Sequence, residues 1–418
     1  MAGFQSIDVH ATYRQLIKSV SLLCLFMLTL ALINSRERIR ILAWTLLLSG
    51  TFQAVYGTLV AISEGSSASG TFINRNHLAG YLEMTLAVGI GLLIADLNRD
   101  DTTRWREKLR RWINTLLGPK ARVRICLALM VTGLILTQSR MGNAAFFTAL
   151  LLAGIAGLII FRRSSRSVIL LFSSLIIIDT LLMGAFFGID KLQERIEQTD
   201  VSGDTRVYGN KLALEFLVNT FTITGDQESE EGTATPSDDT AKEATIAQRQ
   251  ATAADATEIS EQESSGGKAR QAGGGSTAKQ TALIEKEPAG FSMPARTIVL
   301  GTGAGTYYTF FPLYRDQNVP LQNVHAHNDF FEFGLEFGIV GSILLITLVV
   351  VTFVTAIKAQ TGRRSRLMQA MGFATMMAIF SLMIHSFTDF NLQIYANAAT
   401  YIVILALPFI VSRRAQVS

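Results

Sequence analysis

The chain has 418 residues, of which 49% are hydrophobic and only 17% are charged, and its formal net charge is +4. Soluble domains carry about 25% charged residues, and here the apolar residues gather in uncharged runs long enough to cross a bilayer. This composition excludes a soluble enzyme, a disulfide-rich secreted domain and a collagen-like chain. The runs do not alternate apolar and polar residues, which excludes a porin-type barrel.

Nine apolar runs predict an all-α polytopic membrane protein. The predicted helices lie at 16–34, 41–62, 78–97, 124–138, 144–161, 167–188, 337–357, 367–386 and 395–412. They divide the chain into six membrane helices in 1–188, a large loop at 189–336 and three membrane helices in 337–418. The two cysteines, Cys24 and Cys126, fall inside predicted helices and are interpreted as packing residues.

Lys and Arg residues gather on alternate loops, and the short loops between them carry few. By the positive-inside rule the C-terminus is cytoplasmic. The predicted extracytoplasmic loops are 63–77, 139–143, 189–336 and 387–394. We interpret the net positive charge of the chain outside residues 225–290 as suited to anionic lipid and not to nucleic acid.

The large outer loop has three parts of different composition. Residues 189–222 carry apolar residues spaced among polar ones, which predicts an amphipathic helix. Residues 225–290 contain thirteen acids, six bases and no aromatic residue, so we expect a disordered insertion. Residues 296–336 regain aromatic residues, glycines and histidines, and we expect them to be ordered.

Candidate functional residues lie on the predicted outer side. Arg140 is either an interfacial anchor that reaches the headgroups or a functional cation, and Arg206 is a weaker candidate of the same kind. His325 and His327 form a His-x-His pattern that suits a metal clip, but a third ligand is not evident. A single imidazole that acts as a base or holds a hydroxyl is the preferred interpretation. His385, near Asp389, is expected to cap or pack.

A glycine-rich turn, Gly301-Thr302-Gly303-Ala304-Gly305, lacks the spacing of a dinucleotide-binding loop. We interpret it as a turn that lets the backbone approach a ligand or another helix. The sequence has no Walker motif and no Asp-x-Asp pair that would hold Mg²⁺ against a diphosphate.

Several segments, in order along the chain, resemble the O-antigen ligase and polysaccharide polymerase superfamily of bacterial inner membranes. They are Thr71–Gly80, the pair Ser139-Arg140, Arg206, the Gly301–Gly303 turn followed by Phe311–Tyr314, His327-Asn328 with Gly338 and Gly341 beyond, and His385–Phe390. The resemblance covers most of the chain outside 225–290.

The resemblance implies a GT-C-like, metal-independent transferase without cofactors, in the inner membrane, with its large loop in the periplasm. Its donor would be a glycan on undecaprenyl diphosphate, and its acceptor a hydroxyl of a lipid A core, another glycan or a protein. His327 would be catalytic, and Arg140 and Arg206 would bind the donor diphosphate. The supporting residues would be Asn328, Arg75, His325, Gly301 and Gly303.

Two other classes stay open, a transporter or flippase and a structural assembly partner, although no internal repeat favours transport. Members of the family usually have more than nine spans. Nine spans with a cytoplasmic C-terminus place the first residues outside, so we expect that this chain lacks several N-terminal helices of its relatives.

Overall fold

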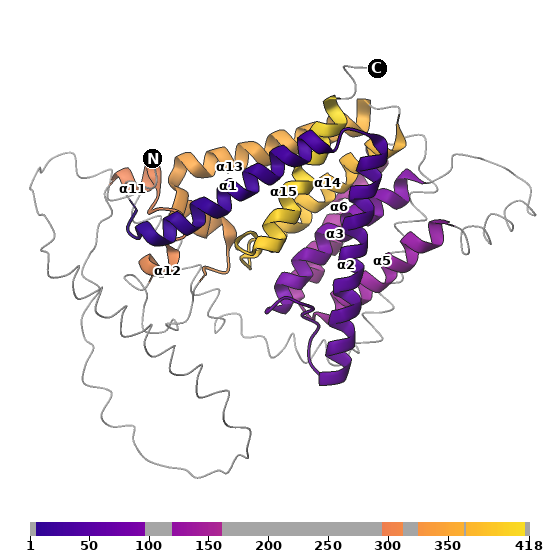
Figure 1. The fold of residues 1–418 in the computed structure, drawn as a ribbon, viewed down its shortest axis with the longest axis horizontal. Helices are drawn as coiled ribbons and strands as arrows, with labels where there is room; N and C mark the ends of the chain where they lie inside the picture. Colours follow the sequence, from indigo (N-terminus) through magenta and orange to yellow (C-terminus); the bar gives the residue numbers. More distant parts are fainter. Residues whose placement is uncertain (1–5, 97–118, 161–294, 312–324, 363–364, 414–418) are drawn as a thin grey trace, which may run out of the picture. The chain divides into compact units, whose positions relative to one another are not determined.

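The computed structural model describes residues 6–96, 119–160, 295–311, 325–362 and 365–413 (Figure 1). All of them belong to one compact unit, formed by Met1–Leu217 with Met293–Ser418. These residues form helices and connecting turns, with no strand among them. The predicted helices at 167–188 and 189–222, the insertion at 225–290 and Arg206 lie outside the described residues.

The long helices account for most of this unit. They are α1 (Val9–Leu32), α2 (Arg36–Glu64), α3 (Arg75–Ala95), α5 (Pro119–Leu136), α6 (Arg140–Ile160), α13 (Asp329–Gly362), α14 (Arg366–His385) and α15 (Tyr395–Arg413). The short elements are α11 (Ala295–Leu300), α12 (Tyr307–Phe310) and the 3₁₀ turn η3 (Asn391–Gln393). Among the described residues, 7 helices, all the long ones except α5, are long and apolar enough to cross a membrane. The predicted all-α polytopic membrane fold is confirmed.

Most helices begin several residues before their predicted start. Hydropathy detects only the segment inside hydrocarbon, whereas the helix continues to a polar cap. Asp8 Oδ1 accepts the Ala11 amide at 2.9 Å before α1, Ser35 Oγ accepts the Arg38 amide at 3.0 Å before α2, and Asn74 Oδ1 accepts the Asn76 amide at 2.9 Å before α3. The predictions of 16, 41 and 78 for these three starts were therefore too late.

Helix α3 is the centre of the bundle and packs against α14, α2, α5, α15 and α6 (Figure 1). Every residue from Asn76 to Ile94 is buried, as expected for a helix that is apolar all round. Gly91 permits the close approach of α14, because a Cβ there would stand 2.9 Å from the carbonyl oxygen of Ala370 and from the Cβ of Ala374. The opposite case is α1, most of whose side chains are exposed.

Helix α13 is interrupted at Gly338, where φ is 64° and ψ is −168°. The break separates a first segment, Asp329–Phe337, from the apolar segment that follows and that was predicted to begin at 337. The turn after α11 packs on the break, since the amides of Thr302 and Gly303 donate to the carbonyls of Leu335 and Glu336 at 3.0 and 3.1 Å. The break thus receives main-chain hydrogen bonds from the glycine-rich turn.

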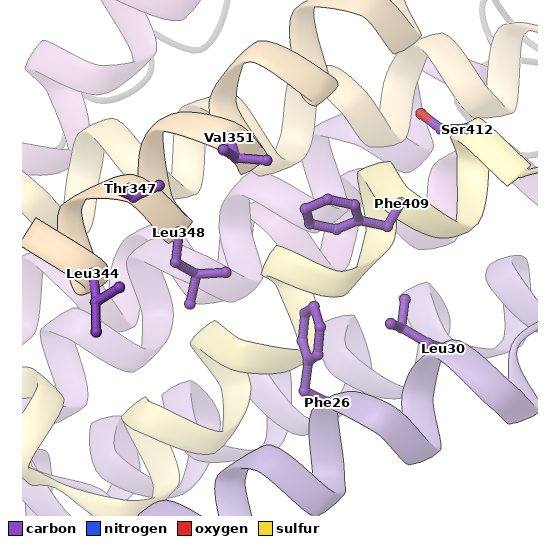
Figure 2. A pocket seen from close by; sticks show the side chains of 8 residues that line it. All are labelled: Phe26, Leu30, Leu344, Thr347, Leu348, Val351, Phe409 and Ser412. Atoms are coloured by element: carbon purple, nitrogen blue, oxygen red, sulfur yellow. The ribbon is translucent and has the colours of Figure 1, made fainter. Parts of the chain in front are cut away.

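An apolar groove of about 590 Å³ lies between α1, α13 and α15 (Figure 2). Its lining carries no charged group and consists of Phe26, Leu30, Leu344, Thr347, Leu348, Val351, Phe409 and Ser412. In α15 these lining residues lie toward the end opposite to Tyr395. The groove is therefore separate from the polar cluster described next.

Candidate functional site

Two histidines from distant parts of the sequence meet one carboxylate at the end of the bundle where α3, α13 and α15 begin. Asp389 lies between α14 and α15. Its Oδ1 is 3.6 Å from Nδ1 of His327 and 3.7 Å from Nε2 of His77. His327 lies two residues before α13. It has a positive φ of 51°, which is uncommon for a residue other than glycine, and keeps 22% of its side chain exposed. Asp389 and His77 are buried, so His327 is the accessible member of the three.

The carboxylate of Asp389 is the charged centre of this cluster. Burial alone would raise its pKa, but the side chains of His327 and His77, the charge of His385 and the amide of Phe390 outweigh burial and hold the pKa well below its ordinary value. Asp389 is therefore ionised at neutral pH. A buried carboxylate at this place favours a proton on the facing nitrogen of each imidazole.

Phe390 gives the histidines a common packing surface. Its ring centre lies 4.3 Å from that of His325 in a stacked arrangement, and 4.7 Å and 4.9 Å from those of His77 and His327 in edge-on arrangements. Stacked and edge-on contacts both occupy the favourable geometries of aromatic pairs. The dipeptide Asp389-Phe390 thus contacts three of the five histidines of the chain.

His325 is held away from Asp389 by a partner of its own. Its Nδ1 lies 2.7 Å from Oε1 of Glu332, whose Oε2 accepts the amide of Ala326 at 3.0 Å. No group of three His, Cys, Asp or Glu side chains that suits a metal ion occurs among the described residues. The geometry therefore gives His325 and His327 different surroundings and does not join them in one clip.

The first segment of α13 carries three buried carboxylates, and each binds a different piece of chain. Asp329 Oδ2 accepts the hydroxyl of Ser386 at 2.7 Å and the amide of Leu392 at 3.1 Å. Glu332 holds the His325 segment, as described above. Glu336 Oε1 accepts the amide of Tyr307 at 3.2 Å. This segment therefore fixes the turn of α12, the His327 segment and the Asp389 loop relative to one another.

A second carboxylate–imidazole pair lies deeper in the bundle. Oε1 of Glu83 in α3 is 2.8 Å from Nδ1 of His385, and its Oε2 accepts the hydroxyl of Ser381 at 2.6 Å. All three residues are fully buried. The prediction that His385 caps or packs did not foresee this ionisable partner.

Lys18 joins α1 to the same loop. Its ammonium donates to the carbonyl of Gln393 at 2.6 Å and lies 4.9 Å from the ring centre of Tyr395. The side chain is buried although it belongs to a predicted membrane helix. α1 thereby supports the loop that carries Asp389.

The two predicted cationic residues that the structure describes lie at helix starts. Arg75 is the first residue of α3 and Arg140 the first of α6, and both are exposed. Arg140 was predicted to lie in a loop; it begins a helix because Ser139 Oγ accepts the amide of Gly142 at 3.2 Å. The first turns of α6 and α3 are adjacent, since a Cβ on Gly142 would stand 2.6 Å from that of Ala79. Arg206, the other arginine predicted to bind the diphosphate, lies outside the described residues.

The other predicted supporting residues have structural contacts. Asn328 Oδ1 accepts the amide of Phe331 at 3.1 Å and so caps α13. Gly301 has a φ of 83°, and a Cβ there would collide with the carbonyl of Glu336. Gly303 lies against Ser6 and Thr12. Asn328 thus builds the helix start next to His327, and the two glycines build the turn that packs on the break in α13.

The sequence interpretation did not single out His77, Glu83 or Phe390. Glu83 had a signal that could have found it, because it is an acid in the middle of an apolar run and intramembrane charge marks functional candidates. His77 and Phe390 lie in segments that carry the family resemblance, Thr71–Gly80 and His385–Phe390, but their roles come from contacts between parts of the chain far apart in sequence.

A protein-family model described as O-antigen ligase matches residues 125–346, which is more than half of the chain. The chain belongs to the O-antigen ligase family. The resemblance noted from the sequence is thereby confirmed. No curated protein and no solved structure matches the chain.

Membership of the O-antigen ligase family, together with the membrane-spanning helices, makes this chain a multi-pass membrane protein of a ligase- or polymerase-like glycosyltransferase kind. The matched range contains Arg140, Gly301 and His327. His77 and Asp389 lie on either side of it.

Proposed function

We propose that this protein transfers a glycan from undecaprenyl diphosphate to an acceptor hydroxyl at the periplasmic face of the bacterial inner membrane. The observation that carries the proposal is the geometry of His327, an accessible imidazole whose Nδ1 faces the buried carboxylate of Asp389 at 3.6 Å. A carboxylate at Nδ1 leaves Nε2 as the nitrogen that takes a proton from an acceptor. Family membership supports the class of reaction.

The donor half of the site is assigned to arginines. A diphosphate is already a good leaving group, so the site needs fixed positive charge where negative charge builds on the leaving oxygen. Arg140 begins α6 and Arg75 begins α3, where the amides at a helix start add to the attraction for anions. We assign Arg140 and Arg206 to the diphosphate and Arg75 to a supporting role.

These residues account for each step of the proposed reaction without a metal ion. The acceptor oxygen forms a bond to the anomeric carbon of the donor sugar, and its proton passes to Nε2 of His327. The bond from the anomeric carbon to the diphosphate oxygen breaks, and the lipid diphosphate leaves with the electron pair. Attack opposite to the leaving group inverts the configuration of that carbon.

The side of the membrane that the site faces is inferred from the charges of the loops. The positive loops at 98–124 and 358–366 are assigned to the cytoplasm. The helix ends that carry His77, His327 and Asp389 are then periplasmic, where nucleotide sugars are absent and a lipid-linked donor is required. The acceptor is a lipid A core, another lipid-linked glycan or a protein hydroxyl.

Purified protein in detergent tests the proposal in a single turnover with a lipid-diphosphate glycan and each of the three acceptor classes. We expect transfer without any gradient, and no loss of rate with EDTA. Transfer that requires a gradient, or movement of the lipid without bond cleavage, would instead indicate a transporter or flippase.

A further inference from the structure

Glu83 is an ionisable residue in the middle of a membrane helix. It has 0% exposed surface, and the rest of α3 from Asn76 to Ile94 is buried with it. A charge in hydrocarbon is costly, and such residues are kept where they perform a task. The reaction proposed above uses neither Glu83 nor its partner His385.

Helix α14 supplies both partners of the Glu83 carboxylate. His385 lies at 2.8 Å from one oxygen and Ser381 donates to the other at 2.6 Å. These two residues are one turn apart and share a face of α14. The chain that continues from His385 reaches Asp389, which contacts His77 of α3 at 3.7 Å. α3 thus contacts the segment from His385 to Asp389 at two places, through His77 near the start of α3 and through Glu83 farther along the helix.

Helix α6 reaches the same carboxylate from another side. A Cβ on Gly142 would stand 3.1 Å from Oε1 of Glu83. Gly142 follows Arg140 by two residues in the first turn of α6. Glu83 therefore lies where three helices meet, and these helices lead to Arg140, to His77 and to Asp389.

We propose that Glu83 is a positioning residue that, through His385 and the first turn of α6, holds the arginine and histidine sides of the site in register. This inference rests on the proposed transfer reaction. Glu83 itself touches no substrate in this arrangement. Since a misplacement of about 1 Å at a reacting centre costs about 10²-fold in rate, a residue that fixes this register acts on turnover more than on donor binding.

The competing interpretation is that the pair only holds two helices together, as polar contacts in membranes do. The two interpretations differ in what an apolar replacement does. Removing one partner of a buried pair is destabilising, whereas replacing both by apolar residues of similar volume is often neutral or stabilising. The double variant Glu83→Leu/His385→Leu therefore separates loss of function from loss of folding.

The experiment compares this double variant with Glu83→Gln and with Thr375→Val as a control. Thr375 is also buried in α14, and its hydroxyl lies 3.1 Å from the Met371 carbonyl of the same helix and 3.2 Å from the Ile404 carbonyl of α15. Its loss therefore removes a buried polar group between helices away from the site. For each protein we measure melting temperature, kcat and donor KM in detergent. The ¹⁵N resonances of the five histidines report ring environment independently of activity.

We expect the double variant to fold, to lose between about 10- and 100-fold in kcat and to keep its donor KM. Glu83→Gln recovers part of the rate, and the control keeps the wild-type values. The resonances of His77 and His327 shift in Glu83→Gln and not in the control.

Wild-type kcat in the folded double variant would overturn the proposal. If the double variant does not fold, the Glu83→Gln variant tests the proposal. Wild-type kcat and unchanged His77 and His327 resonances in Glu83→Gln would overturn the proposal. If the wild-type protein transfers no glycan from a lipid diphosphate, the proposed reaction is wrong. The resonances of His77 and His327 then test on their own whether Glu83 positions these two rings.

Discussion

At the scale of single residues, the two histidines of the His-x-His pattern are expected to differ. His327→Ala should lower kcat by about 10²- to 10⁴-fold, the usual contribution of a general base. His325→Ala should cost much less, because His325 contacts Glu332 and Phe390 and lies outside the Asp389 contact. Single-turnover transfer of the two variants, at equal membrane expression, measures the difference. Equal losses together with sensitivity to EDTA would favour a metal clip.

The arginines are expected to act on the donor. Arg140→Ala and Arg206→Ala should each lower transfer by about 10²-fold or more, since each removes a charge-assisted contact to a developing charge. Lysine at either position should restore part of the rate, because it keeps the charge and loses the planar fork. Initial rates over a range of donor concentration test this, and full activity of Arg140→Ala would contradict the assignment of the diphosphate.

Asp389 links activity to acid stability. Its lowered pKa means that the folded state favours the carboxylate, so this stabilisation is complete above the ordinary value of 3.8 and disappears as the pH falls toward the lowered pKa. Asp389→Asn should lower kcat and should also remove this part of the acid dependence. Melting temperatures between neutral pH and pH 3 compare the two proteins. Parallel curves would show that Asp389 does not stabilise the fold as an anion.

At the scale of elements, the glycine-rich turn is expected to be intolerant of a side chain for two reasons. Gly301 has a φ of 83°, and a Cβ there would collide with the Glu336 carbonyl. Gly301→Ala should therefore destabilise the protein by more than the roughly 1–3 kcal/mol of left-handed strain. Gly65→Ala is the matched control, since Gly65 has a φ of 64° but nothing within 4 Å of a Cβ. Equal shifts in melting temperature would mean that backbone strain alone matters.

The sequence predicted the helices better than their contacts. Apolar runs sufficed for the seven spans that the described residues contain, because each must satisfy its own backbone in lipid. The runs could not show that α13 begins at Asp329 and breaks at Gly338. His327 was found from its local pattern. Its partner Asp389 and the ring of Phe390 come from a loop far along the chain, and periodicity carries no information on which loops meet.

At the scale of the whole molecule, the segment between 225 and 290 is expected to be dispensable for transfer. It contains no aromatic residue, and the entropic cost of closing a loop changes slowly with its length. A protein without residues 228–286 should retain most of its kcat and its melting temperature. A well-expressed deletion protein that lacks transfer would show that this segment takes part in the reaction.

The buried amine of Lys18 bears on how the molecule is made. Lys18 donates to Gln393, which is 375 residues away, and α1 packs on α15. A ribosome completes α1 long before it reaches the last hairpin, and a lone ammonium in hydrocarbon is costly, so nascent α1 has to keep this amine at the membrane surface. Lys18 can take up its native place only when α15 arrives. Completion of the site is thus tied to completion of synthesis, and a prematurely terminated chain would leave the ammonium of Lys18 without its native acceptor.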